Sequence, residues 1–172
     1  SLSSAVGLGH FSRMCALGKS FSKQNIGAAY FSIFGNVGPR VKLDDLEIPI
    51  VADDSAEYFR LLTALIKKQR IHAVVLDLHK SAEDSNLIDF FKSARSQNIK
   101  LVAVDSLLKH RQYLDYIWLP SIYFDFSKIM FDDVSCEISF GWDHFLLTRN
   151  EEAINWKPGK EVLVLTGGSD VL

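Results

Sequence analysis

Two glycines come directly before a histidine near the start of the chain, and an arginine follows one helical turn later. Gly7 and Gly9 allow a tight backbone turn, and residues 10–24 have the pattern of a helix. His10 would then lie in the first helical turn, where free N–H groups and the helix dipole favour an anionic ligand. We interpret His10 as a candidate catalytic base, Gly7 and Gly9 as substrate-binding, and Arg13 as structural. An ordinary glycine turn with His10 as a helix-start residue is the alternative.

Two apolar, β-branched runs each stop at an aspartate, over residues 73–77 and 101–105. In open parallel sheets, ligands bind beyond the carboxyl ends of the strands. We therefore expect Asp77 and Asp105 on the same rim as the His10 turn, as substrate-binding residues. His79, two residues beyond Asp77, is expected on that rim as well. For either aspartate, a helix cap or a loop anchor is the alternative.

Strand and helix patterns alternate along the chain, and this alternation is typical of a parallel sheet covered on both faces by helices. The predicted fold is therefore α/β and Rossmann-like, with strands 26–34, 73–77 and 101–105 adjacent and parallel. The other predicted elements are a short strand at 48–51 and helices at 55–69 and 84–97. Beyond residue 108 the pattern weakens.

The composition excludes several classes of protein. The 172 residues are 48% hydrophobic, enough for the core of one ordinary domain. A net charge of −2 without a basic stripe argues against nucleic-acid binding. No apolar run is long enough for a membrane span, and no signal peptide is visible. Cys15 and Cys136 lie far apart, so we expect a buried free thiol at Cys15 and a cytoplasmic protein.

No metal or cofactor is predicted. His110, Asp143 and His144 lack the close spacing of common zinc sites, and we interpret them as surface or internally satisfied residues. A dinucleotide site would need an acidic residue about 20 positions after the glycine turn. The strand there ends in Phe34 and Gly35, which argues against NAD.

The last residues begin a new pattern. Pro158 and Gly159 indicate a linker, and EVLVLTGGSD is a buried strand that ends in a glycine turn. We predict a sugar-side domain over 1–157, then a linker and the first strand of a truncated nucleotide-binding domain over 158–172. The predicted nucleotide-binding residues are Gly167, Gly168, Ser169 and Asp170. Strand edges left open at 162–166 and by a missing first strand predict a homodimer.

These motifs resemble those of a known family. The matching residues are Ser3, Ser4, Gly7, Gly9, His10, Arg13, Leu17, Asp77, Asp105, Gly141, Trp142, Leu146, Leu147, Arg149, Glu151, Gly167, Gly168, Ser169 and Asp170. These motifs resemble those of the nucleotide-sugar hydrolases of pseudaminic acid biosynthesis and of the related spore-coat polysaccharide biosynthesis proteins. The resemblance implies the N-terminal half of a two-domain GT-B architecture. It departs from the family in the loop after the third strand, which usually carries D-x-Y, whereas here Leu78, His79 and Lys80 follow Asp77. It also departs at residues 119–122, where LPSI replaces L-N-x-N.

The resemblance implies hydrolysis of a UDP-linked amino sugar, with His10 as the base or orienting group for the attacking water. A GT-B glycosyltransferase, in which an acceptor hydroxyl attacks, stays open. A non-catalytic sugar- or nucleotide-binding module also stays open, and a generic flavodoxin-like domain is a weaker alternative. The isolated chain is expected to be inactive, because a cleft between two domains needs both walls.

Overall fold

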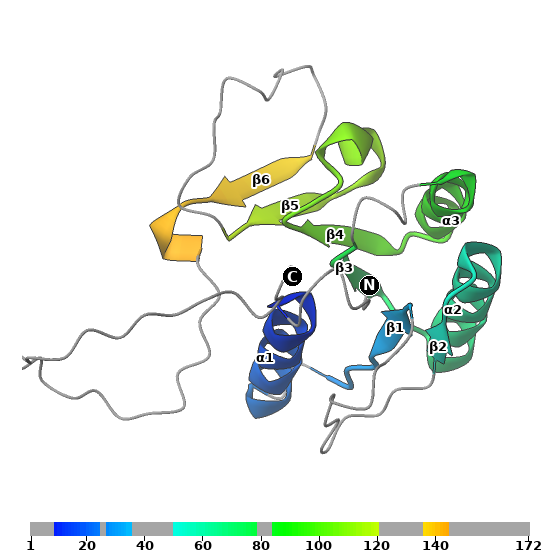
Figure 1. Ribbon diagram of the computed structural model, residues 1–172, viewed down its shortest axis with the longest axis horizontal. Coiled ribbons are helices and arrows are strands. Elements are labelled where there is room, and N and C mark those ends of the chain that lie inside the picture. Colours follow the sequence, from blue (N-terminus) through cyan, green and yellow to red (C-terminus); the bar gives the residue numbers. More distant parts are fainter. Residues whose placement is uncertain (1–8, 25–26, 36–49, 79–83, 121–135, 145–172) are drawn as a thin grey trace, which may run out of the picture.

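The computed structural model describes residues 9–24, 27–35, 50–78, 84–120 and 136–144. Its strands are parallel and alternate with helices, so the predicted α/β, Rossmann-like class is confirmed (Figure 1). The α-helices are α1 Gly9–Lys23, α2 Ser55–Gln69 and α3 Ser85–Ser96, and the 3₁₀ helices are η2 Leu108–Tyr113 and η4 Trp142–His144. The strands are β1 Ser32–Phe34, β2 Ile50–Ala52, β3 Ala73–Leu76, β4 Lys100–Val104, β5 Tyr116–Leu119 and β6 Glu137–Phe140.

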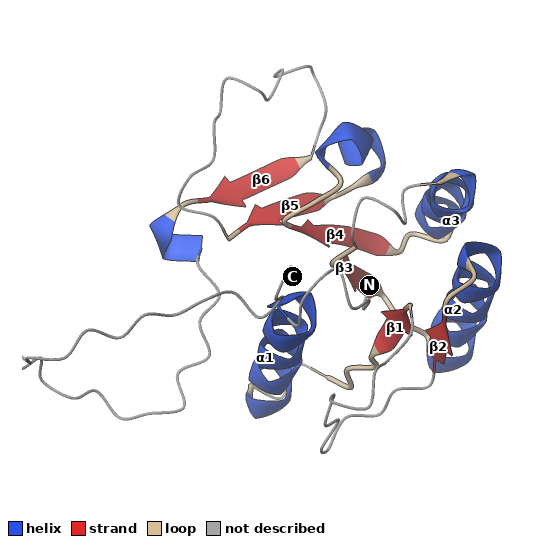
Figure 2. Cartoon of the chain, viewed as in Figure 1, coloured by secondary structure: helices blue, strands red, loops and turns tan. Residues whose placement is uncertain are grey.

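The larger sheet has four parallel strands in the order β3-β4-β5-β6. The predicted parallel pairing of the two strands that lead to Asp77 and Asp105 is therefore confirmed, with Val74 opposite Leu101. The two carboxylates consequently lie at the same edge of the sheet. Figure 2 shows the strands of the sheets in red and the helices in blue.

The predicted adjacency of strands 26–34 and 73–77 is wrong for the described residues. β1 pairs with β2 in a separate two-stranded parallel sheet, while β3 pairs with β4 alone. β1 is also shorter than predicted, because β2 offers partners only to Ser32–Phe34. Between β1 and β3 lies a cavity, and it separates the two sheets.

The two helices that follow β2 and β3 begin at aspartate caps. Asp54 accepts a hydrogen bond from the backbone N–H of Glu57 at 2.7 Å, and Asp84 accepts one from that of Leu87 at 3.1 Å. Such caps satisfy N–H groups that the helix itself leaves free. The observed α2 has the predicted bounds of 55–69.

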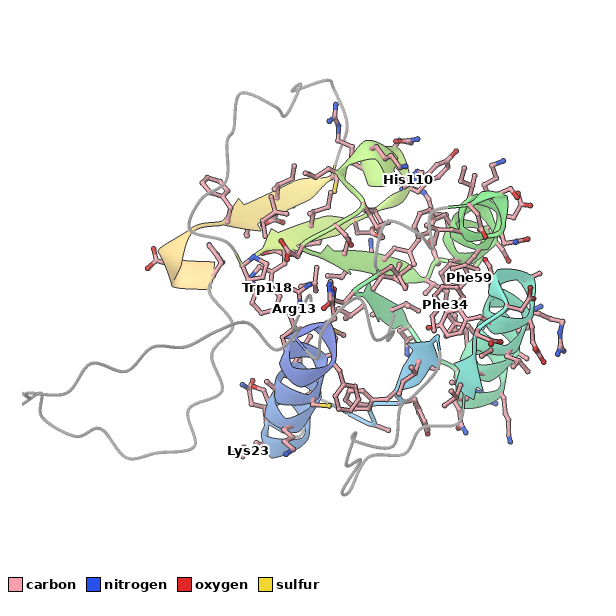
Figure 3. All side chains as sticks on the ribbon, in the orientation of Figure 1. Arg13, Lys23, Phe34, Phe59, His110 and Trp118 are labelled. Carbon is pink, nitrogen blue, oxygen red and sulfur yellow. The ribbon has the colours of Figure 1, made fainter. Side chains whose placement is uncertain are left out.

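The core lies between the strands and the α2 and α3 pair. Phe59 of α2 stacks on Phe90 of α3 with ring centroids 5.2 Å apart, and Phe34 of β1 lies on the same side (Figure 3). The largest fully buried side chains are Leu87, Phe91, Leu101, Val104, Leu114, Ile117 and Leu119. β1 and β3 lie between α1 and the α2–α3 pair in Figure 1. None of the described helices is long and apolar enough to cross a membrane.

Candidate functional site

His10 and Asp77 form a hydrogen-bonded pair where α1 begins and β3 ends. The Nδ1 atom of His10 lies 2.5 Å from Oδ1 of Asp77. Only 2% of the Asp77 side chain is exposed, compared with 26% for His10. Nδ1 also lies 2.9 Å from a terminal nitrogen of Arg13, which can only donate, so of these two neighbours only the Asp77 carboxylate can accept a proton from the ring. Because the contact with the carboxylate is the shorter one, we assign the ring proton to Nδ1. This assignment leaves Nε2 as the nitrogen that can accept a proton, and Nε2 has no hydrogen-bond partner among the described residues.

Arg13 connects α1 to both strand ends. Its Nε and one terminal nitrogen donate to the two oxygens of Asp77, the second at 2.6 Å. The other terminal nitrogen donates to Oδ2 of Asp105 at 2.8 Å. Figure 3 shows Arg13 at the end of α1 nearest the larger sheet. A guanidinium that holds a carboxylate through two bonds fixes its orientation. Arg13 therefore fixes Asp77, and Asp77 in turn orients His10.

The cluster combines one guanidinium with two carboxylates. Burial on its own would lower the pKa of Arg13, but hydrogen bonds to Asp77 and Asp105, together with their negative charges, raise it above its ordinary value. The guanidinium therefore stays positive at any pH at which the protein is folded. With two carboxylates the net charge is −1 when His10 is neutral and zero when it is protonated. The cluster can thus accept a proton without accumulating charge.

Asp105 is the exposed member of the cluster. Its side chain is 41% exposed, and its backbone has a φ of 58°, in the left-handed region that a non-glycine residue seldom adopts. The backbone N–H of Asp105 donates to the carbonyl of Trp118 in β5 at 2.8 Å, which holds this conformation in place. Backbone strain of this kind is often found at functional sites. The free face of the carboxylate is open to a ligand.

The structure brings together three residues of the predicted rim, because His10 and Arg13 of α1 contact Asp77 and Arg13 contacts Asp105. Gly9 is the first residue of α1. The other predicted site residues, Gly7, His79, Gly167, Gly168, Ser169 and Asp170, lie outside the described residues, as does strand 162–166. Their roles stay predictions.

Arg13 has a larger part in the site than its sequence position indicated. Its spacing from His10 places both on one face of α1, but spacing alone cannot show that one side chain reaches two strands. The sequence does contain a signal for this contact. An arginine follows a histidine by one helical turn, and two strands elsewhere end in an aspartate that the arginine could bind. The carboxylate of Asp77 is buried and bound to protein groups, as expected for the anchoring alternative, and its substrate-binding role stays a prediction.

Within the part of the chain that the structure describes, the histidines and cysteines outside the cluster do not form a second site. His110 is half-buried beside Phe91, with ring centroids 6.0 Å apart, and so is not a surface residue. Cys15 and Cys136 are free and half-buried, so Cys15 is less buried than expected. Within the described residues, no group of three histidine, cysteine or acidic side chains is arranged to hold a metal ion.

Comparison of the chain with models of protein families, with curated proteins and with solved structures found no match.

Proposed function

We propose that the protein takes part in the hydrolysis of a nucleotide-linked sugar, with His10 as the general base that activates water. One observation carries the proposal: a histidine bound to a buried carboxylate at the carboxyl edge of a parallel sheet. Ligands bind at this edge in open α/β sheets, and a neutral imidazole held through Nδ1 can accept a proton at Nε2.

In the proposed step, the oxygen of water bonds to the anomeric carbon while the bond from that carbon to the diphosphate oxygen breaks. The proton of the water moves to Nε2 of His10. The leaving diphosphate keeps the bridging oxygen and both electrons of the broken bond. Asp77 stabilises the imidazolium that forms, and Arg13 holds Asp77 in position for this role.

Asp105 is proposed to bind the sugar. One of its oxygens is bound to Arg13, and the side chain is the most exposed of the four. A carboxylate oriented in this way accepts hydrogen bonds from hydroxyl or amide groups. The reacting sugar would then lie between Asp105 and Nε2 of His10.

The choice of a UDP-linked amino sugar rests on the motif resemblance. The motif from Gly7 to Arg13 contains His10, the proposed base. The motif from Gly167 to Asp170 is proposed to lie at the start of the domain that binds the nucleotide. The role in surface or spore-coat polysaccharide biosynthesis is proposed on the same ground. We therefore assign the sugar to the His10 side of the cleft and the nucleotide to the other side.

The test is hydrolysis of a panel of UDP-linked amino sugars by the full-length protein in ¹⁸O-labelled water, with the products analysed by mass spectrometry. Attack at the anomeric carbon places the label in the sugar and none in UDP. Label in UDP would mean attack at phosphorus and would contradict the proposed step. UDP release that requires an added acceptor would indicate a glycosyltransferase, and binding without turnover would indicate a binding module.

A further inference from the structure

Trp118 is an aromatic residue at the carboxyl edge of the larger sheet, and the proposed reaction gives it no role. It belongs to β5 and lies opposite Val104 in β4. The backbone N–H of Asp105 donates to the carbonyl of Trp118 at 2.8 Å. Trp118 is therefore the direct neighbour, on the next strand, of the exposed carboxylate in the functional cluster.

The side chain of Trp118 and the cluster lie on the same face of the sheet. Ile117 and Leu119, the neighbours of Trp118 in β5, belong to the core that the sheet forms with α2 and α3. Because side chains alternate along a strand, the indole points to the opposite face. Val102 in β4 faces the same way as the indole, and it lines the cavity together with Met14 of α1. The indole is consequently on the face of the sheet that α1 covers, and β3 lies between α1 and α3 in Figure 1.

The indole of Trp118 is held in one orientation and is partly accessible. Its N–H donates to the carbonyl of His144 in η4 at 2.6 Å. This bond satisfies the one polar group of the ring. Trp118 is half-buried, and its backbone lies inside the sheet between β4 and β6. The accessible part therefore belongs to the apolar ring, which is open to a ligand.

The strand ends β3, β4 and β5 present these groups in spatial order along one edge. Asp77 follows β3 and holds His10, Asp105 follows β4, and Trp118 is near the end of β5. Neighbouring strands lie about 4.8 Å apart, so the ends of β3 and β5 are roughly 10 Å apart. In Figure 3, Trp118 and Arg13 both lie between the end of α1 and the larger sheet. A ligand that contacts His10 and Asp105 reaches the indole when it extends one strand further.

We propose that the indole of Trp118 binds the apolar face of the sugar ring. The inference rests on the proposed function, because it takes the sugar as the ligand of Asp105. The C–H groups on one side of a pyranose ring carry a small positive charge, and the face of an indole is negative. Asp105 binds hydroxyl or amide groups at the rim of the sugar, while Trp118 packs against its C–H groups. The two residues together select a pyranose with one apolar face.

The experiment measures binding separately from turnover. The probes are UDP and methylene analogues of the UDP-linked amino sugars, in which CH₂ replaces the oxygen between sugar and diphosphate. Dissociation constants are measured by calorimetry with the full-length protein and the variants Trp118→Leu and Trp118→Phe. Tyr116→Leu is the matched control, because Tyr116 is half-buried on the same face of β5 but two residues further from the carboxyl edge.

Trp118→Leu should weaken binding of the analogue roughly five- to tenfold, because the aromatic face is lost. Trp118→Phe keeps an aromatic face and should remain within about threefold of wild type. The affinity for UDP should be unchanged in both variants, since the sugar alone contacts the indole. Tyr116→Leu should bind the analogue and UDP as the wild type does.

Wild-type affinity of Trp118→Leu for the analogue would overturn the inference. An equal loss of affinity for UDP would also overturn it, because Trp118 would then support the whole cleft, and so would an equal effect of Tyr116→Leu. If Trp118→Leu does not fold, oxidation of the wild-type indole by N-bromosuccinimide is followed by mass spectrometry. Slower oxidation of Trp118 with the analogue than with UDP supports the inference, and equal rates overturn it.

Failure of this inference and failure of the proposed function give different results. Binding of the analogue that depends on Trp118, without hydrolysis of any UDP-linked amino sugar, contradicts the role of His10 as a base and supports the role of Trp118. Hydrolysis with normal binding in Trp118→Leu contradicts only the role of Trp118. A protein that binds none of the analogues overturns both.

Discussion

Replacement of Asp77 by asparagine should destabilise the protein more than any other single change in the functional cluster. The Asp77 carboxylate accepts hydrogen bonds from Arg13 and His10, and only 2% of its side chain is exposed. Asparagine keeps the shape but loses the charge, and its amide N–H₂ group would face a donor. Arg13, itself 18% exposed, would then be left with Asp105 alone.

The expected loss in the free energy of unfolding follows from this buried, charged environment. Removal of one partner of a buried ion pair costs about 3 to 5 kcal/mol. Because Arg13 keeps the exposed carboxylate of Asp105, and asparagine keeps one acceptor oxygen, we expect a loss of about 2 to 3 kcal/mol in the free energy of unfolding. For a chain of this size, the thermal midpoint would fall by roughly 4 to 12 °C.

The assay is urea unfolding followed by circular dichroism, with Asp105→Asn as the matched control. The Asp105 side chain is 41% exposed, so its ion pair with Arg13 should be worth under about 1 kcal/mol. The reasoning fails if Asp77→Asn lowers the free energy of unfolding no more than Asp105→Asn does, with the same slope against urea concentration. The buried cluster would then not stabilise the fold. Asp77→Asn should also favour the proton on Nε2 of His10, the wrong tautomer for a base.

Three further predictions concern the rest of the fold. Leu87→Ala should lower the free energy of unfolding by about 2 to 5 kcal/mol, because the side chain is fully buried, and a smaller loss in urea unfolding than Leu87→Met would contradict this packing. Burial would raise the pKa of Asp84, but hydrogen bonds, chiefly from Ser55 and the backbone of Leu87, lower it. Asp84→Ala should therefore cost about 1 kcal/mol at pH 7. The difference from wild type should shrink as the pH falls from the unfolded pKa of about 3.9 through the lower folded pKa, since protonation removes the charge that strengthens the hydrogen bonds of the cap; a difference in urea unfolding that does not change between pH 7 and the acid limit of folding would argue against a charged cap. Burial, with the charge of Asp115, raises the pKa of Cys136 to about 11. Iodoacetamide at pH 8 should therefore label Cys136 roughly a hundredfold more slowly in the folded protein than in urea, as followed by mass spectrometry, and equal rates would contradict the pKa.

Elements with a local signal could be predicted from the sequence. Residues 55–69 have an aspartate cap, an apolar stripe and helix-forming residues throughout, so the bounds of α2 agree with the pattern. The runs before Asp77 and Asp105 are β-branched and apolar, which is sufficient to predict parallel strands with both carboxylates at one edge.

Features that depend on distant partners could not be predicted. β1 was expected beside β3, but it pairs with β2, because the pairing of Ser32–Phe34 depends on residues 50–52. Arg13 has a long side chain whose end point is decided by the packing of α1 against two strands. The burial of Asp77 depends on the same packing, so its role in orienting His10 could be seen only in three dimensions.

The central claim is that His10 accepts a proton in the chemical step, and the most direct test is the kinetics of His10→Asn in the full-length protein. His72→Asn is the matched control, since His72 is exposed at the opposite end of β3. We predict that His10→Asn lowers kcat for UDP release by roughly 10² to 10⁴-fold with little change in KM, while His72→Asn has wild-type kinetics. A His10→Asn variant with full kcat would contradict the account and make His10 a helix-start residue only.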